Sequence, residues 1–310
     1  MTASSLFTKR AAEDEPPLVG EHRFSTVLPA GVDTRPRKVF RYTYGEARAS
    51  TDGHGSYGFG KRTIQEFDGG VDAWTPGPLF STTDLTYFNE DFARAGLLRS
   101  KTVTSGQLTN AIDGFVRPAR RSIEETRIYE KIIHDTTNHP TIVFPALKQS
   151  TIKVIDKPEA GSDLVVSTTI EDFTSGAIRT DYDGYGNSMY HFRQVFAGDN
   201  AGRLVTSSLT VRSFKPADTG RWLVGLVQNT QVSDTRGGET TTRIIGSEYD
   251  DASGRLIQRT RDPGGAFEQI EEFHYDDPVH NLTERILRGG QKHRSVRYLY
   301  DDASLIFPVS

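Results

Sequence analysis

Closely spaced acidic, asparagine and glycine residues form the first stretch of this sequence that could carry chemistry. Residues 181–187 read DYDGYGN, and oxygen ligands beside a glycine are what Ca²⁺ prefers. An EF-hand loop also needs a third ligand before the glycine and a bidentate Glu at its twelfth position, where this chain has Phe192. The stretch therefore favours a structural turn, and the sequence predicts neither a metal site nor a cofactor.

Other catalytic and ligand-binding patterns are incomplete. His134 and His139 lack the two further N or S donors of a structural zinc site, and the chain has no Cys. Residues 60–63 (GKRT) resemble part of a phosphate loop but run into a strand pattern instead of a helix. No Gly-x-Ser-x-Gly nucleophile elbow occurs.

Adjacent carboxylates are the remaining candidates for acid–base chemistry. A glycosidase needs two carboxyl groups that face each other across a cleft, whereas these pairs are expected at turns or on outward strand faces. The pairs are Glu124–Glu125, Asp250–Asp251, Glu271–Glu272 and Asp276–Asp277. We predict that the chain is not an enzyme, and a hydrolase on a β scaffold is kept as an alternative.

Charge and composition exclude several classes of protein. The formal net charge is −4 over 310 residues, and the basic clusters at 35–38 and 117–121 lack interleaved aromatic residues, so no nucleic-acid partner is predicted. No apolar run approaches the roughly 18 residues that a transmembrane helix needs. The first ten residues contain no apolar core of a secretory signal.

The elements that must position these residues follow a period of two. Phe40, Tyr42 and Tyr44 alternate with Arg41 and Thr43, which is typical of a half-buried strand. Similar runs, rich in Thr, Val, Ile and aromatic residues and bounded by Gly, Asp, Asn or Pro, occur at 62–67, 85–88, 98–104, 164–173, 209–214, 240–249 and 296–300. Residues 122–133 fit either a helix or a strand, and their neighbours favour a strand. The sequence thus predicts an all-β meander of antiparallel strands and hairpins.

A repeated Tyr-Asp turn marks the second half of the chain. The last three Tyr-Asp pairs begin 26 and 25 residues apart, and periods of this length indicate stacked supersecondary units. We expect Tyr to end a strand with its ring buried, Asp to accept backbone N–H groups, and Gly or Asn to supply the positive φ of the turn. The repeat residues are Tyr182, Asp183, Gly186, Asn187, Tyr249, Asp250, Gly254, Arg255, Leu256, Tyr275, Asp276, Asn281, Tyr300 and Asp301.

These units resemble RHS/YD repeats, although His280 replaces the usual Gly before Asn281 and the last unit lacks both Gly and Asn. Upstream, residues 42–48 (YTYGEAR) and 57–62 (YGFGKR) resemble a segment that precedes the repeats in the B component of insecticidal toxin complexes and in SpvB-like proteins. Residues 143–151 (VFPALKQST) and 222–225 (WLVG) are similar to further strings of that group.

The resemblance implies a curved shell segment that helps to encapsulate and deliver a toxic polypeptide. It implies other shell or toxin-complex polypeptides and an enclosed effector as partners, in a hetero- or homo-oligomer, and export from the cytoplasm by a dedicated secretion route. Relatives also carry a β-propeller and a self-cleaving motif around Asp-Pro-x-Gly, whereas residues 262–265 (DPGG) are expected to form only a turn, so the chain resembles part of a shell.

Three regions are expected along the chain. Residues 1–38 form a loosely packed N-terminal segment, 39–175 a toxin-complex-like β region, and 176–310 the Tyr-Asp repeat region. A surface β module that binds carbohydrate or protein is the alternative function, which exposed aromatic residues on strands would support.

Overall fold

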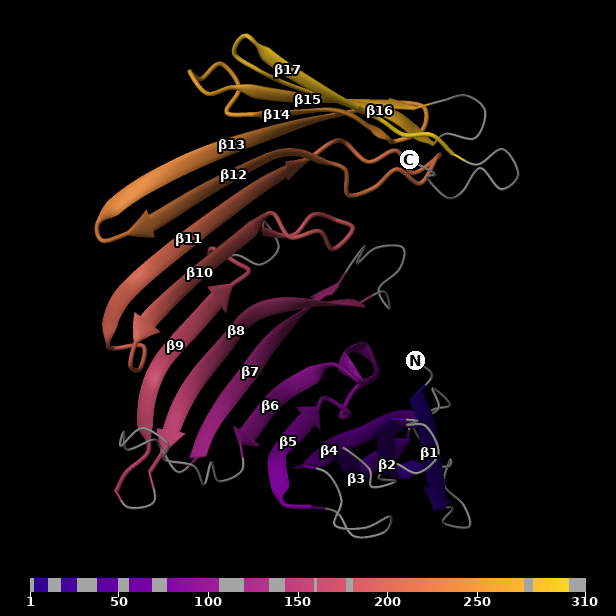
Figure 1. Ribbon diagram of the computed structural model, residues 1–310, viewed down its shortest axis with the longest axis vertical. Helices are drawn as coiled ribbons and strands as arrows, with labels where there is room; N and C mark the ends of the chain where they lie inside the picture. The colour runs from indigo at the N-terminus through magenta and orange to yellow at the C-terminus, as the bar shows by residue number, and fades with distance from the viewer. Residues whose placement is uncertain are drawn as a thin grey trace. The chain divides into compact units, whose positions relative to one another are not determined.

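A computed structural model describes residues 3–10, 18–26, 38–49, 56–68, 77–105, 120–133, 143–158, 161–176, 181–275 and 281–300. The elements that these residues form are strands and one short 3-10 helix (Figure 1). In chain order they are β1 (Ala3–Arg10), β2 (Leu18–Thr26), β3 (Lys38–Ala49), β4 (Ser56–Asp68), β5 (Leu79–Tyr87), η1 (Phe92–Arg94), β6 (Leu98–Ser105), β7 (Arg120–Ile133), β8 (Val143–Lys157), β9 (Leu164–Asp172), β10 (Tyr190–Ala197), β11 (Arg203–Phe214), β12 (Val227–Arg236), β13 (Glu239–Tyr249), β14 (Leu256–Arg261), β15 (Gln269–Tyr275), β16 (Leu282–Gly289) and β17 (Lys292–Arg297). No helix in the described part of the chain is long and apolar enough to cross a membrane.

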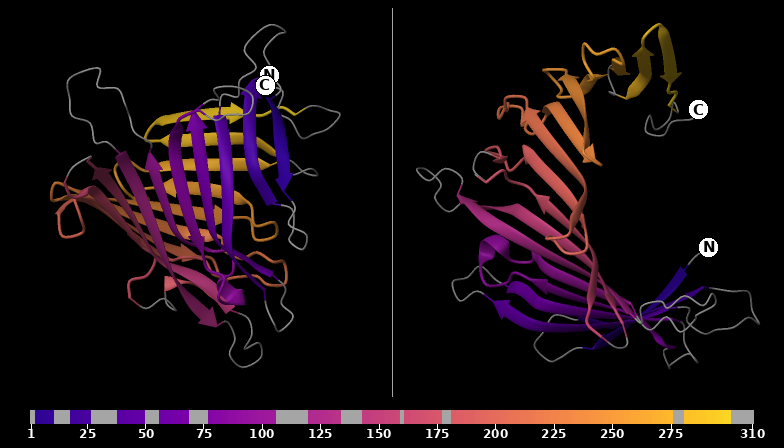
Figure 2. Two further views of the ribbon diagram at one scale, coloured as in Figure 1. Left: turned by 90° about the horizontal axis from the view of Figure 1, so that it is seen from below. Right: turned by 90° about the vertical axis from the view of Figure 1, so that its left-hand side faces the viewer.

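The chain divides into two compact units. The first unit contains Met1–Glu171 and Val195–Leu204, and the second contains Asp172–Gln194 and Val205–Ser310. In the first unit, strands β1 to β8 each pair antiparallel with the next strand along the chain. Strands β11 to β17 pair in the same way in the second unit (Figure 2). The predicted all-β antiparallel meander is therefore confirmed.

The alternation predicted for β3 is present in the structure. Phe40, Tyr42 and Tyr44 are half-buried, whereas Arg41 and Thr43 are exposed. Residues that alternate along a strand lie on opposite faces of the sheet, so one set shields apolar surface while the other meets water.

The strand interpretation of residues 122–133 is also confirmed. They belong to β7, whose register with β8 runs from Arg120 opposite Lys157 to Ile133 opposite Val143. A helix over these residues would satisfy the backbone locally, but here the partner strand β8 supplies the hydrogen bonds.

The first 38 residues include two paired strands. The register of β1 and β2 begins with Ala3 opposite Thr26, and β2 is linked to β3 by an ion pair of 2.9 Å between Glu21 and Arg41. The division of the chain at 38 and 175 stays a prediction, while the two compact units separate near Glu171.

Few large side chains are fully buried. Val39, Ser122 and Thr168 are the largest below 2% exposure among the described residues. Apolar side chains such as Ile123, Leu164 and Ile244 are exposed on the strands. Backbone ladders and cross-strand pairs, more than a thick core, therefore hold these strands together.

Candidate functional site

The Tyr-Asp turns of the second unit lie at one end of its hairpins. Tyr249 ends β13, Tyr275 ends β15 and Tyr300 follows β17. Successive antiparallel hairpins bring these chain reversals to the same edge of the meander. Asp276 and Asp301, which the sequence also assigns to the repeat, lie outside the described residues.

Each of these three tyrosines donates a hydrogen bond to the first residue of the neighbouring strand. The hydroxyl of Tyr249 donates to the carbonyl of Val227 (2.9 Å), that of Tyr275 to Leu256 (2.9 Å) and that of Tyr300 to Leu282 (3.0 Å). The acceptors are the first residues of β12, β14 and β16. In each of the hairpins β12–β13, β14–β15 and β16–β17, a tyrosine at or just after the end of the second strand therefore bonds to the start of the first strand, opposite the turn. Partial burial also raises the pKa of Tyr275.

Two of these tyrosines also pair with the first strand of the following hairpin. Tyr249 pairs with Leu256 and Tyr275 with Leu282, in each case directly after a β-bulge. The carbonyls of Leu256 and Leu282 then accept the hydroxyls of Tyr275 and Tyr300. One hairpin is thus linked to the next by a repeated bulge, backbone pair and hydroxyl bond, which we call the tyrosine ladder (Tyr249, Tyr275 and Tyr300).

The aspartates of the motif hold the turns by accepting backbone N–H groups. Oδ1 of Asp250 accepts from Ala252 (2.8 Å) and Ser253 (3.2 Å), and Gly254 has the positive φ of 71°. These two bonds hold the pKa of Asp250 below its ordinary value. The guanidinium of Arg255 lies 5.5 Å from the ring centre of Tyr275, so the motif's Arg contacts the next ladder tyrosine.

The first turn uses its carboxylate in the same way. Oδ1 of Asp183 accepts the backbone N–H groups of Tyr185 (2.9 Å) and Asn187 (2.8 Å), and Oδ2 accepts the Asn187 side chain (2.8 Å). Both oxygens are committed to the loop itself, and Gly186 has a φ of 86°. This arrangement is an Asx-type turn. The described residues contain no cluster of His, Asp and Glu with metal-binding geometry, and His134 and His139 lie outside them.

Sequence reasoning missed that the loop between β11 and β12 packs against both kinds of turn. A Cβ atom at Gly254 would lie 2.6 Å from Cδ2 of Leu223, and one at Gly225 would lie 2.9 Å from Oδ1 of Asn187. Lys215 forms an ion pair with Asp251 at the base of this loop. The WLVG string at 222–225 was the available signal, but nothing in the sequence links it to Asn187, 38 positions before Gly225, or to Gly254, 31 positions after Leu223.

Adjacent carboxylates point to opposite faces of their strand. Glu271 is 3% exposed and forms ion pairs with Arg285 and, at 3.7 Å, with Arg259. Its neighbour Glu272 pairs instead with Arg288 (3.0 Å). The hydrogen bond to Glu271 raises the pKa of Arg285. These carboxyl groups therefore do not face each other across a cleft, and Asp276 and Asp277 lie outside the described residues.

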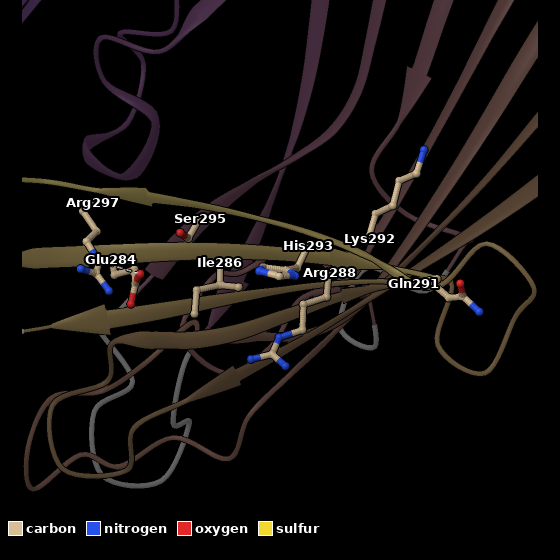
Figure 3. Close-up of a pocket in the computed structure, with 9 residues that line it drawn as sticks. Glu284, Ile286, Arg288, Gln291, Lys292, His293, Ser295 and Arg297 are labelled. Atoms are coloured by element: carbon tan, nitrogen blue, oxygen red, sulfur yellow. Dashed lines mark hydrogen bonds and ion pairs between the residues drawn. The ribbon is translucent and has the colours of Figure 1, made fainter.

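A polar hollow of about 540 Å³ lies on one face of the hairpin β16–β17 (Figure 3). The residues that line it are Glu284, Ile286, Arg288, Gly290, Gln291, Lys292, His293, Ser295 and Arg297. Arg297 forms an ion pair with Glu284 (3.1 Å), and Arg288 pairs with Glu272. Both arginines of the hollow are therefore paired with carboxylates, whereas Lys292, which also borders it, forms no ion pair with any described residue.

Three solved structures share the fold over most of this chain. They are described as TcdB2-TccC3-Cdc42 (TM-score 0.61, 8% identity, 92% of this chain), TcdB2-TccC3 without its hypervariable C-terminal region (0.59, 9%, 92%) and TcdB2-TccC3 (0.51, 10%, 83%). This chain spans only 16 to 20% of the length of those chains. At such low identity the likeness shows the fold alone. The chain matches no protein-family model and no curated protein.

Proposed function

We propose that this chain is a non-enzymatic structural segment of an RHS/YD-repeat toxin shell, which helps to encapsulate and deliver a toxic polypeptide. The tyrosine ladder is the observation that carries the proposal. It repeats one linkage over β12 to β17 and adds hairpins one after another, as an extended wall requires. The fold shared with toxin-complex structures supports the same role.

Strand β17 is the place where such a wall would continue. All six of its residues are exposed, and within the second unit it pairs only with β16 among the described strands. An unpaired strand edge offers a row of N–H and C=O groups to another chain. We therefore assign to β17 the contact with a further shell polypeptide, in an assembly that is exported from the cytoplasm by a dedicated route.

A proline substitution tests this contact without breaking the hairpin. The N–H of Tyr298 donates to Thr283 of β16, so by alternation the N–H of Ser295 points away from β16. Ser295→Pro removes that outward donor, and Ser295→Ala is the matched control.

The measurement is light scattering of the purified chain, together with co-purification with a repeat-rich polypeptide if a neighbouring gene encodes one. We expect a stable complex with the unaltered chain and with Ser295→Ala, and a weakened complex with Ser295→Pro. A strictly monomeric chain that captures no such polypeptide would overturn the shell assignment.

Exposed aromatic residues favour a second candidate, a surface module that binds carbohydrate or protein. Trp222 is 74% exposed at a φ of 58°, and Phe267 is 85% exposed. Both lie in loops instead of on strands. A glycan array tests this function: specific binding that is lost in Trp222→Ala would support it, and an array without binding would count against it.

A further inference from the structure

The two faces of the sheet formed by β14 to β17 differ in how their charges are paired. The registers place Thr260, Ile270, Arg288 and His293 in one row across these strands, and Arg261, Gln269, Gly289 and Lys292 in the neighbouring row on the opposite face. Because alternate residues of a strand share a face, these two rows fix the face on which each residue of the four strands lies.

On the first face both arginines and His274 lie beside acidic partners. Arg288 pairs with Glu272 at 3.0 Å, Arg297 with Glu284 at 3.1 Å, and His274 lies 3.8 Å from Glu272. Most of the residues that line the hollow of Figure 3 belong to this face, and Lys292 of the neighbouring row also borders it at the hairpin turn.

The opposite face carries an excess of positive charge. Its basic side chains are Arg259, Arg261, Arg285, Lys292 and Arg294, and its acidic side chain is Glu271. Arg259 and Arg285 share Glu271. Arg261, Lys292 and Arg294 are exposed and form no ion pair with any described residue. We call this surface the arginine face.

Aliphatic side chains lie between these cations. Ile257, Leu287 and Val296 belong to the arginine face and are each exposed. A ligand for this surface must therefore offer both negative charge and apolar groups.

We infer that the arginine face binds an acidic polypeptide in an extended conformation, which under the proposed shell function is the enclosed cargo. Arg261 and Lys292 lie three strand spacings apart, about 14 Å, and Lys292 and Arg294 are about 7 Å apart along β17. Carboxylates on alternate residues of an extended peptide repeat at about 7 Å, which matches this spacing. Between Arg261 and Lys292 the row holds Gln269 and Gly289, neither of which adds a charge.

The exposed apolar side chains favour a polypeptide over a nucleic acid. Single-stranded nucleic acids are held by aromatic side chains on which the bases stack. The exposed apolar residues of this face are aliphatic, and they suit the Leu, Ile and Val side chains of an unfolded protein.

Fluorescence anisotropy of the full chain with a dye-labelled, unstructured peptide rich in Glu, Asp and Leu tests the inference. We expect binding that weakens as salt increases, because the attraction is largely between exposed charges. The double variant Arg261→Gln/Arg294→Gln is expected to raise the dissociation constant about tenfold. Arg288→Gln/Arg297→Gln removes the same two charges from the other face and is expected to change it less than about twofold.

Three results would overturn the inference. They are equal losses in the two double variants, a matched Lys-rich and Leu-rich peptide that binds as tightly as the acidic one, and preferential binding of oligothymidine. Failure of the shell function is separate, because it appears in the Ser295→Pro association assay and leaves peptide binding by the isolated chain unchanged.

Discussion

The two units build sheets from the same kind of strand but stabilise them differently. In the first unit a continuous cross-strand row carries side chains on one face, and most of them are apolar. The row is Tyr42, Ile64, Thr83, Val103, Ile123 and Val154. In the second unit the repeated device is instead the tyrosine ladder at the strand ends.

The chain reversals differ in the same way. In the first unit Asn89 is 2% exposed and donates to the carbonyl of Glu46 (2.5 Å), which holds a positive φ of 59°. Nearby, Arg94 and Arg99 lie 4.6 and 4.4 Å from the ring centre of Phe88. These contacts each occur once, whereas the second unit reuses one contact. A contact that occurs once stabilises one loop, whereas the repeated tyrosine contact allows similar hairpins to be added one after another.

The largest loss of stability is expected when the hydroxyl groups of the tyrosine ladder are removed. The triple variant Tyr249→Phe/Tyr275→Phe/Tyr300→Phe removes three hydroxyl bonds and should lower the free energy of unfolding by about 3 kcal/mol. Hydrogen exchange should accelerate in β12 to β17 and stay unchanged in β3 to β8. Tyr57→Phe is the control, because Tyr57 lies in β4 of the first unit and outside the ladder. Uniform acceleration in both units would contradict the comparison.

Removal of the buried asparagine should affect the first unit in turn. Asn89→Ala leaves the Glu46 carbonyl without its donor and opens a small cavity, at a cost of about 2 kcal/mol. Exchange should then accelerate in β3 to β6 and stay unchanged in β12 to β17. An unchanged midpoint of chemical denaturation would show that this contact does not stabilise the loop.

A smaller loss is expected at a turn of the ladder. Gly254→Ala places a Cβ atom against Leu223 at a positive φ, and we expect about 1 kcal/mol of destabilisation. Gly264→Ala is the matched control, since it has a φ of 73° and nothing within 4 Å of the added Cβ atom. The difference between the two midpoints of denaturation measures the contact with Leu223, and equal midpoints would exclude it.

The smallest effect concerns acid stability. In the first unit, partial burial by itself would raise the pKa of Asp91, but hydrogen bonds from Arg94 and Lys131 hold this pKa below its ordinary 3.8. Backbone N–H groups lower the pKa of Asp250 in the second unit. A lowered native pKa stabilises the fold above the unfolded pKa, and this stability is lost as the pH falls below about 4.

With Asp91→Asn or Asp250→Asn, the free energy of unfolding should therefore decrease less than in the unaltered chain as the pH is lowered in an acid titration. High salt should reduce the contribution of Asp91, which has charged partners, more than that of Asp250. The same salt response at both sites would remove this distinction between the units.

Much of the fold could be predicted from local sequence patterns. The alternation of Phe40, Tyr42 and Tyr44, and the Gly and Asx chemistry of residues 182–187 and 249–256, depend on residues within a few positions of one another. A strand over 122–133 could also be predicted, because the neighbouring runs are strands. The acceptor of each ladder hydroxyl could not be predicted, because this acceptor lies 18 to 22 residues away from the tyrosine in the sequence.

The sequence by itself determined that this chain alternates, reverses at Tyr-Asp turns and cannot form disulfides. Only the tertiary structure decided the register, because one residue of slip moves every side chain to the other face. That register separates Glu271 from Glu272 and joins Tyr249 and Tyr275 to the hairpins that follow them. It also leaves Arg261, Lys292 and Arg294 without an ion-pair partner among the described residues. These are cross-strand relations, and they exist only once the strands have paired.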